Sequence, residues 1–181
     1  QIDAQTVLGM MYKAGRGVEQ NDVEAVKWYR KAAEQEDANA QFEIGGMYIN
    51  GLGVAQDYTE AARWYRKAAE QGNEHAQFNL GLMFQDGLGV PQDDAEALQW
   101  FLKAAEKGQA GAQAILGMMY KEGLGVAQDY TEAVKWYQRA AEQGISNAQY
   151  NLGLMYLKGE GVERNDAEAQ KWFFKAADQE D

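Results

Sequence analysis

The chain has 181 residues, a formal net charge of −11, 46% hydrophobic residues and no cysteine. This composition is typical of a folded domain, and the lack of cysteine excludes disulfides, thiolate metal sites and a cysteine nucleophile. No apolar run approaches the ~20 residues that a membrane-spanning helix needs. An acidic chain without a basic tract is also a poor match for the phosphate backbone of nucleic acids.

The sequence is one segment repeated five times at intervals of 36 residues. An Ala-Gln pair, a tryptophan and a Gly-x-Gly-Val segment all recur in register at this interval. The copies span residues 4–39, 40–75, 76–111, 112–147 and 148–181. Because no linker separates the copies, we expect one domain, residues 1–181, built from five equivalent units.

The first half of each copy predicts a helix that runs from the Ala-Gln pair to the first glycine of Gly-x-Gly-Val. Asp3, Asn39 and Asn147 stand just before this helix in three copies. The sixth position of the helix is glycine in every copy, at a cost of about 1 kcal/mol relative to alanine. A glycine kept in mid-helix predicts a close crossing with a second helix.

At 100° per residue along a helix, the residues of this first helix fall on two opposite faces. One face keeps its residues from copy to copy, and the other does not. The constant face carries Ala, Leu or Ile, Met, and Tyr or Phe, and we expect it to hold the repeats together. The opposite, variable face is rich in apolar residues that change from copy to copy, and we interpret it as a binding surface. Its candidate partner-binding residues are Met10, Lys13, Phe42, Ile49, Asn50, Phe78, Leu82, Gln85, Met118, Lys121, Tyr150, Leu154 and Leu157. Packing between helices is the alternative role for the aromatic members Phe42, Phe78 and Tyr150.

The second half of each copy predicts a second helix. It opens with an Asn or Asp that has a glutamate three residues later, the pattern of a capping box. The opening residues are Asn21, Asp57, Asp93, Asp129 and Asn165. Gly72, Gly108 and Gly144 are expected to end the helix as left-handed caps. No strand pattern is present, so the fold class is all-α, an array of antiparallel helical hairpins.

The repeated pattern AQxxLGxMYxxGxGVxxDxxEAxxWYxKAAEQG resembles the Sel-1-like repeat, a relative of the tetratricopeptide repeat. The resemblance covers essentially the whole chain. It implies a right-handed α-solenoid that serves as a protein–protein interaction scaffold, with a concave groove lined by the first helix of each repeat. It also favours a periplasmic or secreted location and leaves a cytoplasmic one open. One branch of the family is rich in cysteine, and this chain departs from it.

The chain ends differ from the inner copies. The inner loops carry Leu52, Leu88 and Leu124 where the outer copies carry Arg16 and Glu160. The glycine of the inner turns is likewise Glu36 and Glu180 at the ends. Such polar replacements resemble the caps of repeat arrays, so five repeats are expected to be near the native array size.

We therefore expect a non-catalytic adaptor that binds a protein or peptide segment in the groove, with no cofactor and no metal. His75 is the only histidine and is expected in a turn between repeats, so the chain lacks a second imidazole for a zinc site or a catalytic triad. Two alternatives stay open. One is a cell-envelope-associated enzyme or regulator of the hydrolase class, and the other is a structural element that assembles end to end through its C-terminal helix.

Overall fold

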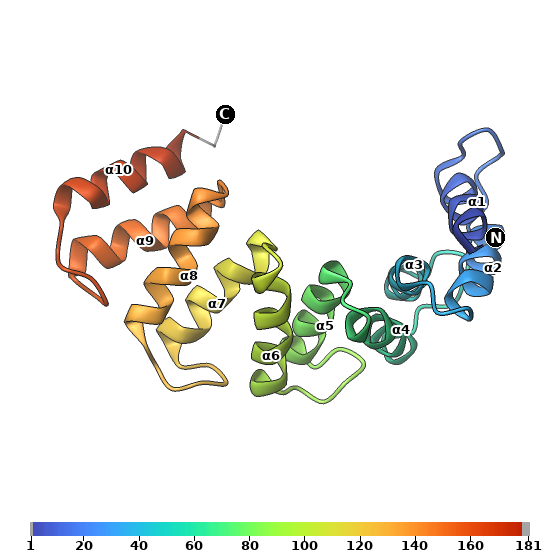
Figure 1. Cartoon of the computed structure of the whole chain (residues 1–181), viewed down its shortest axis with the longest axis horizontal. Coiled ribbons are helices and arrows are strands. Elements are labelled where there is room, and N and C mark those ends of the chain that lie inside the picture. The colour runs from blue at the N-terminus through green and yellow to red at the C-terminus, as the bar shows by residue number, and fades with distance from the viewer. Residues whose placement is uncertain (1, 179–181) are drawn as a thin grey trace. The chain divides into compact units, whose positions relative to one another are not determined.

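The computed structural model describes residues 2–178, which form ten α-helices and no strand (Figure 1). Each repeat contributes one odd-numbered and one even-numbered helix, so the all-α array of helical hairpins is confirmed. The helices are α1 (Ile2–Ala14), α2 (Asp22–Ala33), α3 (Ala38–Asn50), α4 (Tyr58–Glu70), α5 (Glu74–Asp86), α6 (Asp94–Glu106), α7 (Ala110–Glu122), α8 (Tyr130–Glu142), α9 (Ser146–Lys158) and α10 (Asp166–Ala177).

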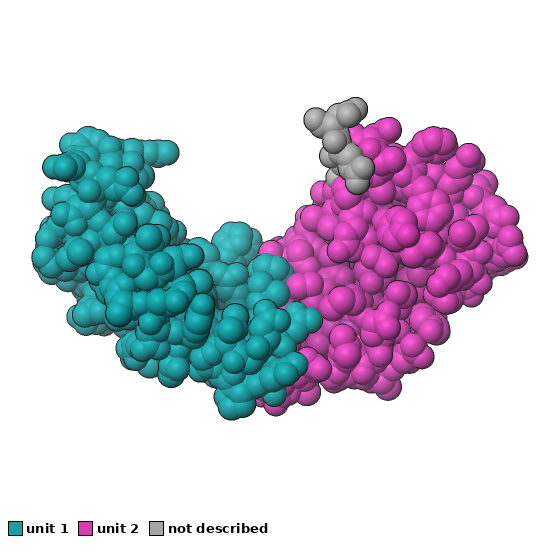
Figure 2. Space-filling model, turned by 180° about the vertical axis from the view of Figure 1, so that it is seen from behind, with its two compact units in different colours: residues 1–92 teal, residues 93–181 magenta. Residues whose placement is uncertain are grey.

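The chain divides into two compact units, Gln1–Gln92 and Asp93–Asp181 (Figure 2). Unit 1 contains α1 to α5, and unit 2 contains α6 to α10. Each unit is described by itself below. That the two units act as one domain stays a prediction.

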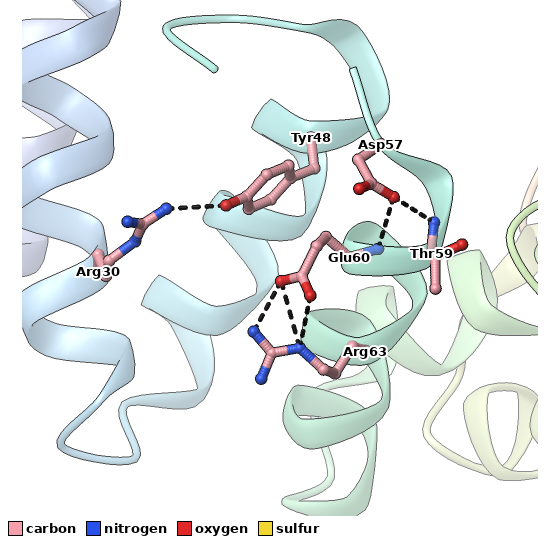
Figure 3. A network of polar contacts seen from close by, with 6 residues as sticks. All are labelled: Arg30, Tyr48, Asp57, Thr59, Glu60 and Arg63. Carbon is pink, nitrogen blue, oxygen red and sulfur yellow. Dashed lines mark hydrogen bonds and ion pairs between the residues drawn. The ribbon is translucent and has the colours of Figure 1, made fainter. Parts of the chain in front are cut away.

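The second helix of each repeat begins at the expected cap, but only half of a capping box forms. The Asp57 carboxylate accepts hydrogen bonds from the backbone N–H groups of Thr59 at 2.9 Å and Glu60 at 3.0 Å (Figure 3). The Glu60 carboxylate does not return a bond to the cap, because it pairs with Arg63 at 2.7 Å. The cap N–H of Asp57 donates instead to the carbonyl of Tyr48 at 3.0 Å. The loop therefore folds back on the first helix and satisfies the N–H that a capping box would use.

The first helices start two residues earlier than the Ala-Gln pattern predicts. Asp37 caps α3 by accepting from the N–H of Ala40 at 2.6 Å, and Asn73 caps α5 in the same way. His75 therefore lies in the first turn of α5 and not in an inter-repeat turn, so that expectation was wrong. Its side chain is exposed and its ring centroid lies 5.8 Å from that of Phe42. The residues expected just before the first helices, Asp3, Asn39 and Asn147, likewise lie inside α1, α3 and α9.

The turns between repeats use a residue with positive φ, as expected. Gly72, Gly108 and Gly144 have φ of 88°, 95° and 88°. The turn after α2 places Glu36 in the same left-handed region, with φ of 67°. A side chain there is strained, since only glycine adopts this conformation without steric cost. Glu180, the other expected replacement, lies outside the described residues.

Replacing Glu36 by glycine should raise the free energy of unfolding by about 0.5–1 kcal/mol. The left-handed conformation costs a side chain about 1–2 kcal/mol, whereas glycine loses about 0.5–1 kcal/mol more entropy on folding. Urea unfolding of the two proteins measures the difference. Glu34→Gly is the control, because Glu34 has φ of −70° at the C-cap of α2, and there glycine should lower stability. A change of the same sign in both variants would contradict the assignment of strain to Glu36.

The constant face of the first helices forms the core together with the second helices. In unit 1 the core cluster joins α2 with α3 and with Trp64 of α4, and in unit 2 it joins α8 with α9 and with Trp172 of α10. Each cluster therefore spans the boundary between two repeats. The unit 2 cluster contains Ala133, Val134, Tyr137, Ala140, Ala141, Ala148, Leu152, Met155 and Trp172.

The mid-helix glycines mark close helix crossings, as their positions predict. A Cβ atom on Gly45 would lie 2.7 Å from the ring of Tyr65 in the second helix of the same repeat. A Cβ atom on Gly117 would lie 2.5 Å from the ring of Tyr137. The same approach occurs at Gly9 and Gly153. Only a residue without a side chain allows the two helices to pack at this distance.

The glutamine of the Ala-Gln pair ties each repeat to the repeat before it. Gln41 is buried and its Nε2 donates to the carbonyl of Ala33 at the end of α2, at 3.1 Å. Its Oε1 accepts from Gln71 of its own repeat at 2.8 Å. The donor bond recurs as Gln77 to Ala69, Gln113 to Ala105 and Gln149 to Ala141. The sequence pattern shows this glutamine but does not reveal its role.

The second glycine of each Gly-x-Gly-Val loop packs on the preceding repeat. A Cβ atom on Gly53 would overlap the carbonyl group of Asp22, and one on Gly89 would overlap that of Tyr58. The same overlap would occur between Gly125 and Asp94 and between Gly161 and Tyr130. We call the contact of one repeat's second helix with the next repeat's first helix and loop a junction. The two units contain four such junctions, two in each.

Candidate functional site

The variable face of the first helices is accessible in every repeat. None of its thirteen candidate residues is buried. Met10, Asn50, Tyr150 and Leu157 are exposed, with exposed fractions of 43% at Met10 and 53% at Tyr150. The half-buried members are Lys13, Phe42, Ile49, Phe78, Leu82, Gln85, Met118, Lys121 and Leu154. By contrast, the constant-face residues Ile44, Leu80, Leu116 and Leu152 are fully buried.

Two aromatic members of the variable face also pack within their own repeats. The ring centroid of Phe42 lies 5.7 Å from that of Tyr65, and Tyr150 lies 5.7 Å from Phe173. Such distances are typical of favourable tilted aromatic pairs. Packing between helices is therefore part of their role, and the exposed ring of Tyr150 still has a large free surface.

The charged members of the variable face have acidic partners nearby. Lys13 of α1 pairs with Glu43 of α3 at 2.7 Å, and Lys121 pairs with Glu122 at 3.0 Å. Exposed pairs of this kind contribute about 0–1 kcal/mol to stability. Their main effect here is to leave the apolar residues of the face in a nearly neutral setting.

A hollow of 380 Å³ lies beside the variable face in unit 1. We call it the α1 hollow. It brings together Met10 and Lys13 of the candidate set with Val7, Met11 and residues of two further helices. Its full lining is Val7, Met10, Met11, Lys13, Ala14, Arg16, Tyr29 and Glu43.

The candidate set leaves out six residues of this hollow, namely Val7, Met11, Ala14, Arg16, Tyr29 and Glu43. A signal was present at Val7, whose position in the other copies holds Glu43, Asn79, Ile115 and Asn151. That position varies as much as the variable face does. Tyr29 could not be found in this way, because its position is aromatic in every copy and its constancy indicates packing.

The hydroxyl of Tyr29 is the unusual polar group of the α1 hollow. Tyr29 is fully buried, and its hydroxyl has no hydrogen-bond partner among the described residues. Burial, and then the charge of Glu43, raise the pKa of Tyr29, so the hydroxyl keeps its proton. In the next repeat the equivalent Tyr65 hydroxyl hydrogen-bonds to Asn79. A buried donor without an acceptor costs about 1–3 kcal/mol.

Unit 2 has two further hollows, both beside α10. One of 550 Å³ is lined by Leu157, Asp166, Ala169, Gln170, Phe173, Phe174 and Ala177. The other, of 590 Å³, is lined by Ser146, Asn147, Tyr150, Phe173, Ala176 and Ala177. The candidate residues Leu157 and Tyr150 thus each line one of the two hollows beside α10.

Residues 2–178 contain neither a cluster of metal ligands nor a membrane-spanning helix. No group of three or more histidine, aspartate or glutamate side chains there is arranged to hold a metal ion. Within the same range, no helix is long and apolar enough to cross a membrane.

Comparisons with known proteins identify the repeat. The family model described as Sel1 repeat matches residues 2–37, 38–73, 74–109, 110–145 and 146–181. These segments keep the 36-residue period and begin two residues before the copies defined from the Ala-Gln pair. No curated protein sequence matches the chain.

Solved structures share the same fold. The crystal structure of c5321, a protective antigen of uropathogenic Escherichia coli with an SLR fold, is 42% identical and has a TM-score of 0.97. It covers 99% of this chain, which spans only 38% of that protein. A Sel1 repeat protein from Oxalobacter formigenes is 39% identical with a TM-score of 0.95, and covers 100% of this chain and 74% of its own. Helicobacter pylori cysteine rich protein B, at 23% identity and a TM-score of 0.55, covers 69% of this chain and 90% of its own, and shows the fold alone.

Proposed function

Because the chain belongs to the Sel1 repeat family, whose members generally serve as protein-interaction scaffolds, we propose that it is a non-catalytic adaptor that binds a segment of a partner protein along the variable face. The observation that carries the proposal is the contrast between the two faces of the first helices. The constant face is buried in the junctions, whereas the variable face keeps apolar side chains accessible. Apolar surface left exposed on a rigid helix is available to a partner at a low cost in conformational entropy.

The α1 hollow indicates which segment fits best in unit 1. Val7, Met10 and Met11 offer an apolar wall for one anchoring side chain. Lys13 and Arg16 stand at its border, and Arg16 forms no ion pair with any described residue. We therefore assign to this hollow an apolar anchor that is followed or preceded by an acidic residue.

Val7→Glu should weaken binding of such a segment by at least about tenfold, because burying a valine is worth about 1.5 kcal/mol or more. Segments are first selected from a displayed library of random peptides with the wild-type chain, and their affinities are then measured by calorimetry. Val23→Glu is the matched control. Val7 is 51% exposed and Val23 is 50% exposed, but Val23 lies on α2 and outside the hollow.

The selected peptides should carry an apolar residue beside Asp or Glu, and Arg16→Glu should weaken them while far-UV helicity stays unchanged. Equal affinity for Val7→Glu and the wild type would show that the segment binds elsewhere. Equal losses for Val7→Glu and Val23→Glu would show that the added negative charge acts at long range and that the hollow has no special role.

A further inference from the structure

The four junctions inside the two units are built from the same parts. The second helix of one repeat offers two alanines, an aromatic ring and one backbone carbonyl near each of its ends. The next repeat offers the alanine and glutamine of its Ala-Gln pair, a leucine or isoleucine, and the second glycine of its loop. Residues of both halves are buried at every junction; the alanines of the Ala-Gln pairs, for example, are 0% exposed at Ala40, Ala76, Ala112 and Ala148.

The first repeat carries one half of a junction, and no described residue covers that half. Ala4 is exposed and Leu8 is half-buried, although both positions are fully buried in the later repeats. Gln5 accepts from Gln35 at 2.7 Å, as Gln41 does from Gln71, and it forms no described bond like that of Gln41 to Ala33. A Cβ atom on Gly17 would meet only a methionine methyl group of its own repeat, at 3.5 Å.

The last repeat presents the complementary half. Ala177 is exposed, and the equivalent Ala33, Ala69, Ala105 and Ala141 are at most 2% exposed. Phe173 is half-buried, and the equivalent Tyr29 and Phe101 are fully buried. Both residues line the two hollows beside α10, and the larger part of that lining is apolar. Asp166, whose position supplies the carbonyl that a loop glycine covers at each junction, lines one of them.

We propose that the chain associates head to tail, with α1 and the Gly17 loop of one copy docked on α10 of a second copy. This contact reproduces the junction that the chain already makes four times. Gln5 donates to the carbonyl of Ala177, Gly17 covers the carbonyl of Asp166, and Leu8 packs on Phe173. One departure is Gln170, which stands where the other repeats have Val26, Ala62, Leu98 and Val134, and another is Arg16, which stands where the inner loops have Leu52, Leu88 and Leu124.

A contact between two different faces leaves one of each kind free after the first contact, so the assembly grows beyond two copies, as an open array or as a ring of several copies. This property separates it from a two-fold symmetric dimer formed through α10 alone, which closes at two copies. The proposal does not depend on peptide binding, because Val7, Met10 and Lys13 of the α1 hollow differ from Ala4, Gln5 and Leu8 of the junction half, although Met11 belongs to both surfaces.

The test uses one substitution in each half. Ala4→Glu places a carboxylate at a position that is 0% exposed in every junction, and it suits the first turn of a helix. Ala177→Lys blocks the other half and suits the last turn of a helix. Ala95→Glu is the control, since Ala95 is exposed in the first turn of α6. Circular dichroism checks that all variants fold.

Sedimentation equilibrium should show the average mass of the wild type and of Ala95→Glu rising with concentration. Each blocked variant alone should remain monomeric, with association weakened at least tenfold. An equimolar mixture of Ala4→Glu and Ala177→Lys should form a one-to-one dimer and nothing larger, because one intact face remains on each. A wild-type chain that is monomeric throughout would overturn the proposal, and so would a mixture without dimer. Dimers formed by Ala4→Glu alone would overturn it in favour of symmetric pairing through α10.

Discussion

Replacing Gly89 by alanine should lower the free energy of unfolding by about 2–5 kcal/mol. Gly89 has φ of +69°, a conformation that costs a side chain about 1–2 kcal/mol. The added Cβ atom would also overlap the backbone carbonyl of Tyr58 at the start of α4. A backbone group cannot move aside as a flexible side chain does, so the loop must separate from the preceding repeat. Overpacking of this kind adds about 1–3 kcal/mol.

Gly17→Ala is the matched control for Gly89→Ala. Gly17 is the same loop position in the first repeat and has φ of +74°, but its nearest contact for a Cβ atom is at 3.5 Å. Only the conformational cost of about 1–2 kcal/mol applies there. Denaturant unfolding of both variants, at a concentration where the chain is monomeric, measures the difference. Equal losses at the two positions would show that the junction contact contributes nothing.

The fold was predictable because the five copies can be compared with one another position by position. Five copies in register show which positions never change, and a position such as Gly45 keeps a residue that is unfavourable in a helix. That combination has one simple physical reason, a close helix crossing, and the structure confirms it through Tyr65. The caps of the second helices were equally visible, since Asp57 accepts from the two N–H groups that the pattern predicts.

The details that the sequence did not reveal depend on contacts between segments. The first helices begin two residues early because Asp37 and Asn73 are able to cap them, and an Asx residue nearer the Ala-Gln pair was an equally good candidate. Glu60 pairs with Arg63 and not with the cap, because the loop already satisfies the cap N–H. The role of Gln41 required knowing that the end of α2 lies beside it.

The candidate site was also predictable only in part, because it too depends on contacts between segments. Variation between copies correctly separates accessible residues such as Met10 from buried ones such as Met47. It says nothing of which accessible residues share a hollow, because the α1 hollow takes its lining from three helices. Tyr29 in particular keeps the aromatic character of its position and differs from Tyr65 only in the neighbour of its hydroxyl. That difference arises from Glu43 standing where the next repeat has Asn79.

Gly45→Ala should lower the free energy of unfolding by about 1–3 kcal/mol, although alanine is intrinsically better in a helix by about 1 kcal/mol. The new methyl group would lie 2.7 Å from two ring atoms of Tyr65, which is 4% exposed and has no free space to move into. α3 must then move away from α4, and the junction contacts of Gln41 move with it. Gly46→Ala is the control within the same helix, since its Cβ atom would meet only the Tyr65 hydroxyl at 3.5 Å.

The two neighbouring substitutions should therefore have opposite signs, because Gly46→Ala gains the helix propensity of alanine, about 1 kcal/mol, without a clash. Thermal and urea unfolding of both variants measure this directly. A double-mutant cycle identifies the cause: in a Tyr65→Ala background the ring is gone, so Gly45→Ala should no longer destabilise the protein and should gain the same propensity term. If Gly45→Ala remained costly without the ring, the mid-helix glycine would be required by the backbone of α3 and not by the crossing with α4.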